Sequence, residues 1–251
     1  MLHQFSRTEL AIGPEGLEVM KGSTVAVLGI GGVGSIAAEA LARTGVGRII
    51  LIDKDVVDIT NVNRQIHALT TTVGQPKAEL MQERIKLINP ECDAIALRMF
   101  YTEETYEQLF DYKPDYVLDA SDTISYKIHL IKQCLDRKIP MISSMGAANK
   151  MDPTKFQVAD ISKTTMDPIA RVVRTKLRKE GIKKGVKVVF STEEPKKPRE
   201  DVTQRIVPEN APEIRKAQQP PASNAFVPPV AGLIMVSVCV KDLLHNAGID
   251  V

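Results

Sequence analysis

The sequence predicts an α/β protein with a Rossmann-like, doubly wound and mostly parallel sheet, followed by a C-terminal extension. Two short runs rich in valine and isoleucine, Thr24–Leu28 and Arg48–Ile52, have the composition of strands that are buried on both faces. Segments of helical composition separate such strands, and strands that alternate with helices form a parallel sheet with helices on both sides. A glycine-rich turn also joins the first strand to the helix after it.

The core elements have clear boundaries. Residues Ser35–Arg43 predict a helix that ends at Gly45, because glycine is the favoured residue type just after a helix. A second helix begins near Pro76 and runs to about Asn89, where Pro90 stops it. Three further elements complete the core: a strand at Asp115–Leu118, a helix at Ile124–Asp136 and a strand at Met141–Ser144.

The pattern changes after residue 144, where the predicted extension begins. Phe156–Ile161 has the composition of an edge strand, Pro168–Glu180 of an amphipathic helix, and Val186–Phe190 of a further strand. The stretch Glu193–Pro221 is polar and contains six prolines, which predicts a long, mobile loop. An apolar helix over Val230–His245 closes the chain.

Length and composition fit one soluble domain. The 251 residues suffice for a single large domain over 1–251, with a core at about 22–150 and an extension at about 151–251. Hydrophobic residues make up 43% of the chain, and the net charge is +2. Bulk charge therefore demands no polyanionic partner, so any interaction with nucleic acid must depend on local charge.

Cysteine use points to the cytoplasm. The three cysteines, Cys92, Cys134 and Cys239, are far apart and form no CxxC pair, which argues against zinc and against a disulfide framework.

The longest uncharged apolar run, Phe226–Val240, is shorter than the roughly 20 residues that a membrane-spanning helix needs. We expect it to pack on the core or on a dimer partner, with peripheral membrane contact as the alternative.

The glycine turn predicts a nucleotide site. Its glycines are Gly29, Gly31, Gly32 and Gly34, and they allow a tight turn that lets a phosphate approach the backbone at the N-terminus of a helix. Asp53 ends the next strand, where a carboxylate would accept hydrogen bonds from a ribose. This pattern alone favours an NAD enzyme about as much as an ATP enzyme.

Cationic and acidic residues near the expected phosphate site separate ATP from NAD. Cleavage of a triphosphate needs cations at the leaving group, and Arg64, Lys77 and, more remotely, Arg7 could supply them. Asp119 ends a later strand and could hold Mg²⁺, with Asp122 as a weaker candidate. Each residue also has an ordinary interpretation, because surface arginines and lysines are common and both aspartates could cap the helix at Ile124.

These motifs together resemble the nucleotide-binding core of the ubiquitin-activating-enzyme-like (ThiF-type adenylating) superfamily. The motifs are GxGGxGS, Asp53, NxNRQ, Lys77 and DASD. The resemblance implies that Asp53 binds the ribose, that Asn61, Arg64 and Lys77 handle the phosphates, and that Asp119 binds magnesium. It also implies a homodimer in which Arg7 reaches into the partner's site. The full set predicted to bind ATP is Gly29, Gly31, Gly32, Gly34, Asp53, Asp55, Asn61, Asn63, Arg64, Gln65, Lys77 and Arg7, with Arg64, Lys77 and Asp119 as catalytic residues.

Within that superfamily, the second half of the chain resembles the tRNA threonylcarbamoyladenosine dehydratases. The resemblance is carried by NRQIHAL, SSMGAANKMDPTKFQVADISKT, DPIARVVRTKLRKEGI, VVFSTE and FVPPVAGL. It implies cyclisation, with ATP, of the threonylcarbamoyl group on an adenosine beside the tRNA anticodon, and a sulfur-relay protein is a further expected partner. The loop Glu193–Pro221 has no cysteine to form a thioester, and Cys239 has the surroundings of a core thiol. Adenylation of the carboxylate followed by attack within the same side chain needs no enzyme nucleophile.

A basic helix is the predicted tRNA contact. Between Lys163 and Lys187 there are nine lysines or arginines and two acids. On the helix, Arg171, Arg174 and Arg178 share one face, while Ile169, Val172, Val173 and Leu177 share the other. Taken without the resemblance, a solvated amphipathic helix is the better interpretation; with it, the basic face is our best candidate for binding tRNA phosphates.

Three other functions compete. The first is an adenylating sulfur-transfer enzyme that acts on a ubiquitin-like carrier protein, against which the missing CxxC pairs and loop cysteine argue. The second is a nucleotide-binding scaffold without turnover. The third is an NAD-dependent oxidoreductase, in which Arg64, Lys77 and the DASD carboxylates would have no evident task.

Overall fold

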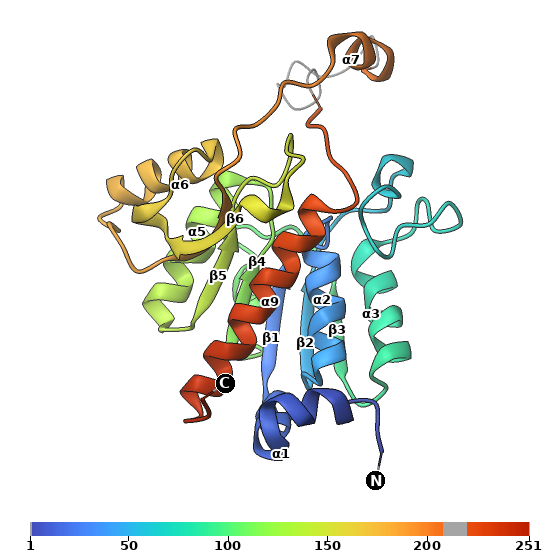
Figure 1. The fold of residues 1–251 in the computed structure, drawn as a ribbon, viewed down its shortest axis with the longest axis vertical. Coiled ribbons are helices and arrows are strands. Elements are labelled where there is room, and N and C mark those ends of the chain that lie inside the picture. Colours follow the sequence, from blue (N-terminus) through green and yellow to red (C-terminus); the bar gives the residue numbers. More distant parts are fainter. Residues whose placement is uncertain (1, 208–219, 251) are drawn as a thin grey trace.

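The computed structural model describes residues 2–207 and 220–250 and is built on one seven-stranded sheet (Figure 1). The strands are β1 (Thr24–Leu28), β2 (Arg48–Ile52), β3 (Asp93–Leu97), β4 (Tyr116–Asp119), β5 (Met141–Ser144), β6 (Phe156–Asp160) and β7 (Lys187–Ser191), in the spatial order β3-β2-β1-β4-β5-β7-β6. All neighbours pair in parallel except β6 and β7, which are antiparallel. The predicted fold class and the edge position of β6 are confirmed.

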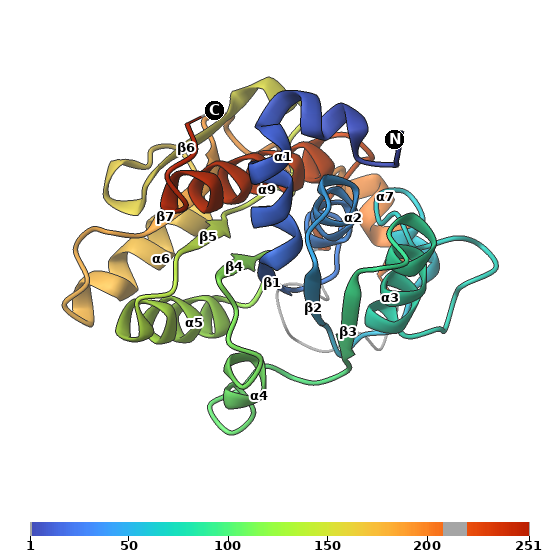
Figure 2. The same cartoon turned by 90° about the horizontal axis from the view of Figure 1, so that it is seen from below.

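Helices cover both faces of the sheet (Figure 2). One layer contains α1 (Ser6–Gly22), α2 (Gly34–Thr44), α3 (Lys77–Ile88) and α9 (Val227–Asn246), and the other contains α4 (Glu107–Phe110), α5 (Ile124–Arg137) and α6 (Pro168–Lys179). A further helix, α7 (Glu200–Ile206), lies beyond the carboxyl edge of the sheet (Figure 1). Single turns of 3-10 helix in the described residues are η1 (Ile59–Asn61), η2 (Pro153–Lys155) and η3 (Ile161–Lys163).

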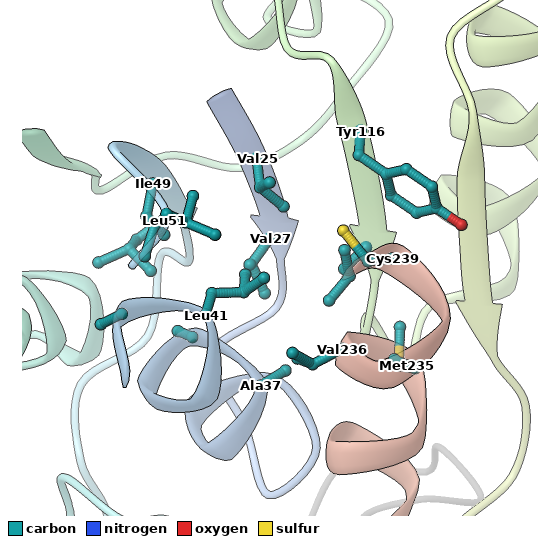
Figure 3. Close-up of a cluster of buried hydrophobic side chains, with 14 of the residues drawn as sticks. Val25, Val27, Ala37, Leu41, Ile49, Leu51, Tyr116, Met235, Val236 and Cys239 are labelled. Carbon is teal, nitrogen blue, oxygen red and sulfur yellow. The ribbon is translucent and has the colours of Figure 1, made fainter. Parts of the chain in front are cut away.

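Strand β1 shows why the sequence builds two cores. Successive side chains of a strand point to opposite faces, so Val25 and Val27 join the core under α2 and α9, while Ala26 and Leu28 join the core under α5 and α6. Figure 3 shows the first of these cores, with Cys239 of α9 packed between the helix and the sheet. Cys239 is fully buried, which confirms the prediction that it is a core thiol.

Helix α9 is longer than the sequence pattern predicts, because it begins at Val227 and continues to Asn246. It packs along α2 and over the sheet, as expected for a core helix. Its length and mean hydropathy of 1.7 would also suffice to cross a membrane, but half of that stretch is buried inside the protein. The argument that the apolar run is too short is therefore wrong, whereas the expectation of packing is confirmed.

The structure adds elements that the sequence pattern did not reveal. Helix α1 was missed because its polarity is mixed and because it kinks at Gly13, just before Pro14. The short strand β3 and the one-turn helix α4 were also missed. The stretch 193–221, predicted to be a loop throughout, contains α7 at its centre; residues 208–219 of it lie outside the described residues.

Candidate functional site

The strand order places the candidate site. In the sheet β1 lies between β2 and β4, so the chain progresses in opposite directions on the two sides of β1. Crossover connections that diverge in this way leave a crevice at the carboxyl ends of the strands, which is where open α/β sheets bind ligands. The glycine turn follows β1, Asp53 follows β2, and the DASD segment begins at the end of β4. The structure therefore brings the predicted motifs to one edge of the sheet.

The glycine turn needs two of its glycines for its own shape. A β-carbon on Gly34 would lie 1.8 Å from the carbonyl oxygen of Gly29, which excludes any side chain there. Gly29 itself has φ +88°, and a β-carbon on it would lie 2.9 Å from the carbonyl oxygen of Ala120. The turn therefore packs closely between the start of α2 and the end of β4, which leaves no room for a side chain at either position.

Gly31 has no such steric reason to be glycine. The nearest atom to a β-carbon there would be Gln65 Nε2 at 4.0 Å, so an alanine would meet only ordinary van der Waals distance. Open space beside a backbone at the N-terminus of a helix is the arrangement that admits a phosphate group. The turn thus fits a nucleotide phosphate without rearrangement of the chain.

Asp53 is fixed at the mouth of this turn. Its Oδ2 accepts a hydrogen bond from the Ile30 backbone N–H at 2.7 Å, and its Oδ1 accepts one from the Asp55 N–H at 2.8 Å. Burial raises the pKa of the Asp53 carboxyl, against the lowering effect of these two donors and of Lys77. A carboxylate held this way, next to the turn, is positioned to accept hydrogen bonds from a ribose.

The NxNRQ segment folds around η1. Asn61 is buried, and its Oδ1 accepts a hydrogen bond from the Asp58 N–H at 3.1 Å, so its amide shapes the loop. Asn63 instead donates from Nδ2 to the carbonyl oxygen of Ser223 at 3.1 Å, which ties this loop to the segment before α9. Asn61 therefore has a structural role in this loop, and its contact with a phosphate stays a prediction.

Two cations flank the turn. Arg64 is partly buried, and its Nη1 donates to the carbonyl oxygen of Thr60 at 2.9 Å and to Asn63 Oδ1 at 2.8 Å. Burial lowers the pKa of this guanidinium, and within residues 2–207 and 220–250 it has no ion-pair partner. Lys77 opens α3 with 7% of its surface exposed, and its Nζ lies 3.6 Å from Asp55 Oδ2. Both side chains belong to the same edge as Asp53.

Two buried polar groups beside these cations have no partner among the described residues. They are Gln65 Oε1 and both ring nitrogens of His67, a residue that is only 4% exposed. Burial, with the nearby charges of Lys77 and Arg84, lowers the pKa of His67 to about 4. The sequence motifs assign no role to His67, although it lies two positions after the NxNRQ segment.

Asp119 occupies the expected place, but it is already bound. Its side chain is fully buried at the end of β4, and Lys127 of α5 places Nζ 3.0 Å from Oδ2. Asp122 is exposed at the surface, where Thr123 Oγ1 donates to it at 3.4 Å. The part of the chain that the structure describes contains no group of three His, Cys, Asp or Glu residues arranged to hold a metal. The residues present therefore do not form a ready magnesium site.

Arg7 lies far from the site within one chain. It is exposed near the start of α1, and the end of α1 is tied to the start of β2 through the Gly47 N–H and the Met20 carbonyl oxygen. Figure 1 shows α1 at the end of the sheet opposite to the glycine turn. Arg7 of the same chain is therefore not part of the site at this turn.

The basic helix differs from its prediction at two positions. Arg174 does not stand free, because its Nη1 donates to the carbonyl oxygen of Thr164 at 2.8 Å and to the hydroxyl of the same residue. Val172, assigned to the buried face, is 42% exposed, while Val173 and Leu177 do face the core. The exposed basic surface of α6 is therefore centred on Arg171 and Arg178.

A model of the ThiF family matches residues 5–249. The chain belongs to the ThiF family. Among its relatives, the tRNA threonylcarbamoyladenosine dehydratase of Bacillus subtilis is 73% identical over 98% of this chain and 96% of that protein. The crystal structure of the Escherichia coli tRNA N6-threonylcarbamoyladenosine dehydratase, TcdA, in complex with ATP superposes with a TM-score of 0.85 and 38% identity, covering 98% of this chain and 95% of that one.

A second ThiF branch matches less of the chain. The molybdopterin-synthase adenylyltransferase of Escherichia coli is 34% identical over 55% of this chain and 54% of its own length. The Bacillus subtilis and Escherichia coli relatives that match 98% and 80% of this chain share one name, and the resemblance of the C-terminal motifs to the dehydratases is confirmed.

Proposed function

We propose that this protein catalyses the ATP-dependent dehydration of N6-threonylcarbamoyladenosine in tRNA to its cyclic form. The observation that carries the proposal is the 73% identity, over nearly both full lengths, to a protein of that name. The geometry supports it, because the open cradle at Gly31 and the cations Arg64 and Lys77 suit a triphosphate. The ATP complex of the similar Escherichia coli protein supports ATP as the nucleotide.

The proposed reaction has two steps. A carboxylate oxygen of the threonylcarbamoyl group attacks the α-phosphorus of ATP, and pyrophosphate leaves while Arg64 and Lys77 offset its charge. An oxygen or nitrogen nucleophile of the same side chain then attacks the activated carbonyl carbon, loses its proton and displaces AMP. The sum is loss of one water from the nucleoside and conversion of ATP to AMP and pyrophosphate. Since all three cysteines are buried, the chain offers no exposed thiol for a covalent intermediate.

The decisive experiment incubates the protein with ATP, magnesium and tRNA that carries threonylcarbamoyladenosine. Mass spectrometry of the released nucleosides should show a loss equal to one water. Lys77→Met should abolish the product, whereas Lys86→Met, an exposed lysine of the same helix, should not. If pyrophosphate exchange instead depends on a ubiquitin-like carrier protein and not on the modified tRNA, the sulfur-transfer function replaces this proposal.

We propose Arg171 and Arg178 as the centre of the tRNA surface, since both are exposed on a helix with four further exposed or flanking cations. Arg171→Glu with Arg178→Glu should weaken tRNA binding and flatten its salt dependence, while ATP binding stays unchanged. The charge-matched control is Lys86→Glu with Lys241→Glu, which changes exposed lysines of α3 and α9. Equal tRNA affinity of both double variants would remove this surface from the proposal.

We further propose a homodimer whose sites are completed by Arg7 of the other copy. The support is its position, exposed and at the end of the sheet opposite to its own glycine turn. Mixing Arg7→Ala with Lys77→Met, each inactive alone, should restore activity in mixed dimers, with roughly a quarter of all sites intact after random exchange. No recovery after confirmed subunit exchange would contradict it. A cytoplasmic location, a sulfur-relay partner and Mg²⁺ that enters with ATP complete the proposal.

A further inference from the structure

The Asp119 carboxylate has every hydrogen-bonding position in use. Its Oδ1 accepts from the Ser121 N–H at 3.1 Å and from the Ser121 hydroxyl at 2.7 Å. Its Oδ2 accepts from Lys127 Nζ at 3.0 Å and from the Ser143 hydroxyl at 2.6 Å. A carboxylate has about four lone-pair positions, so these four donors satisfy it completely.

Lys127 is the unusual member of this cluster. Lysine is almost never buried unless it is paired, and here the side chain of Lys127 retains 2% of its exposure and that of Asp119 none. Lys127 comes from the first turns of α5, eight positions after Asp119, and its Nζ also lies 3.4 Å from Ser143 Oγ. The helix thus places a cation on the acidic side chain that ends β4, at the topological switch point of the sheet.

This arrangement conflicts with a metal ion at Asp119. A divalent cation such as Mg²⁺ needs carboxylate oxygens that are free to coordinate it, and it would be repelled by an ammonium that sits on the same oxygen. Within the described residues no other His, Cys, Asp or Glu pair joins Asp119 to form a site. In the structure, the charge that balances Asp119 is therefore that of Lys127.

We propose that Lys127 is a positioning residue that keeps Asp119 from binding a divalent cation when no nucleotide is present. The residues around Asp119 therefore do not fit a divalent cation in the nucleotide-free protein. This inference concerns the nucleotide-free protein and does not depend on the proposed function. In this way, Lys127 prevents a metal ion from binding in the crevice before ATP binds there.

The test measures Mn²⁺ binding to the full chain without nucleotide, by the electron paramagnetic resonance signal of free Mn²⁺. Lys127→Gln should bind Mn²⁺ at least about tenfold more tightly than wild type, because it leaves an uncompensated buried carboxylate. Lys127→Arg, which keeps the charge, should behave like wild type. Adding Asp119→Asn to Lys127→Gln should abolish the gain. Wild-type protein that binds Mn²⁺ as tightly as Lys127→Gln would overturn the proposal.

A second variant guards against loss of folding in Lys127→Gln. Ser121→Ala removes the donor hydroxyl from Oδ1 but retains the buried ion pair, so it should fold and still bind no Mn²⁺ without nucleotide. Mn²⁺ binding by Ser121→Ala would show that Lys127 does not control access and would refute the inference. Thermal shifts with ATP are measured in parallel. Loss of ATP binding would contradict the proposed function, yet it would leave the nucleotide-free Mn²⁺ result intact.

Discussion

Substitution of His67 should remove a specific part of the pH dependence of stability. Its imidazole is buried with no partner for either ring nitrogen among the described residues, and the pKa is lowered from 6.5 to about 4. The unfolded chain therefore binds one more proton than the folded protein between those pH values. Because the folded pKa is depressed, the free energy of unfolding is highest above pH 6.5 and falls as the pH decreases toward 4.

The magnitude follows from the size of the shift. One pKa unit corresponds to 1.36 kcal/mol, so a shift of about 2.5 units removes at most about 3.4 kcal/mol at low pH, of which roughly 1.8 kcal/mol is lost between pH 7 and pH 5. His67→Leu has no titrating group and a similar volume, so its stability at pH 7 should differ from wild type by less than about 1.5 kcal/mol.

Urea unfolding of both proteins at pH 7, 6 and 5 checks this prediction. The difference between the wild-type and His67→Leu unfolding free energies should shift by about 1.8 kcal/mol in favour of the variant over that range. His245→Gln, a substitution of an exposed histidine, should run parallel to wild type. Parallel curves for His67→Leu and wild type would refute the argument, since they would mean that His67 titrates alike in the folded and unfolded states.

Three further predictions follow from the site and its surroundings. Gly31→Ala should fold as wild type but lose the thermal shift caused by ATP, whereas Gly34→Ala should also lower the melting temperature without ATP, because its β-carbon would lie 1.8 Å from the Gly29 oxygen. Lys150→Met leaves the fully buried Asp167 without its ion-pair partner at 2.7 Å and should lower the urea-unfolding free energy by about 3–5 kcal/mol; a smaller loss than for an exposed pair such as Lys132 and Glu180 would contradict this. The thiols should not react with a disulfide reagent in the native protein at pH 8 and should all react in urea, because burial raises the pKa of Cys92 to about 11 and of Cys134 to about 12. Rapid labelling of the native protein would show that the thiols are accessible.

The sequence predicts the parts of the site that local chain geometry determines. The glycine turn, Asp53 and Lys77 each adjoin the end of a strand or the start of a helix, so their placement follows once strands and helices are assigned. The partners of side chains depend instead on packing between elements. Lys127 contacts Asp119 only because α5 folds back over β4 and β5, and no local sequence pattern predicts that contact.

The same distinction explains the errors on the basic helix. Helical periodicity gives the angle of each side chain around α6 but not the position of the neighbouring segments. The η3 region places Thr164 where Arg174 can donate to it, so a side chain predicted to bind tRNA is occupied within the protein. Val172 lies toward the buried stripe by angle, yet no element among the described residues covers it, and it remains exposed.

The distribution of charge in the crevice favours an anion as its ligand. Each acidic side chain of the crevice that is buried or partly buried is satisfied within the chain, Asp53 by two backbone N–H groups and Asp119 by Lys127. Arg64, in contrast, donates only to a carbonyl and an amide oxygen among the described residues. Arg64 forms no ion pair among the described residues, although the charge of Asp58 acts on it. A partly buried guanidinium of this kind is further stabilised when phosphate oxygens replace the water that it has lost. The buried acids of the crevice are therefore compensated by groups of the protein, and positive charge remains beside the glycine turn. This distribution of charge suits a triphosphate and disfavours a bare divalent cation.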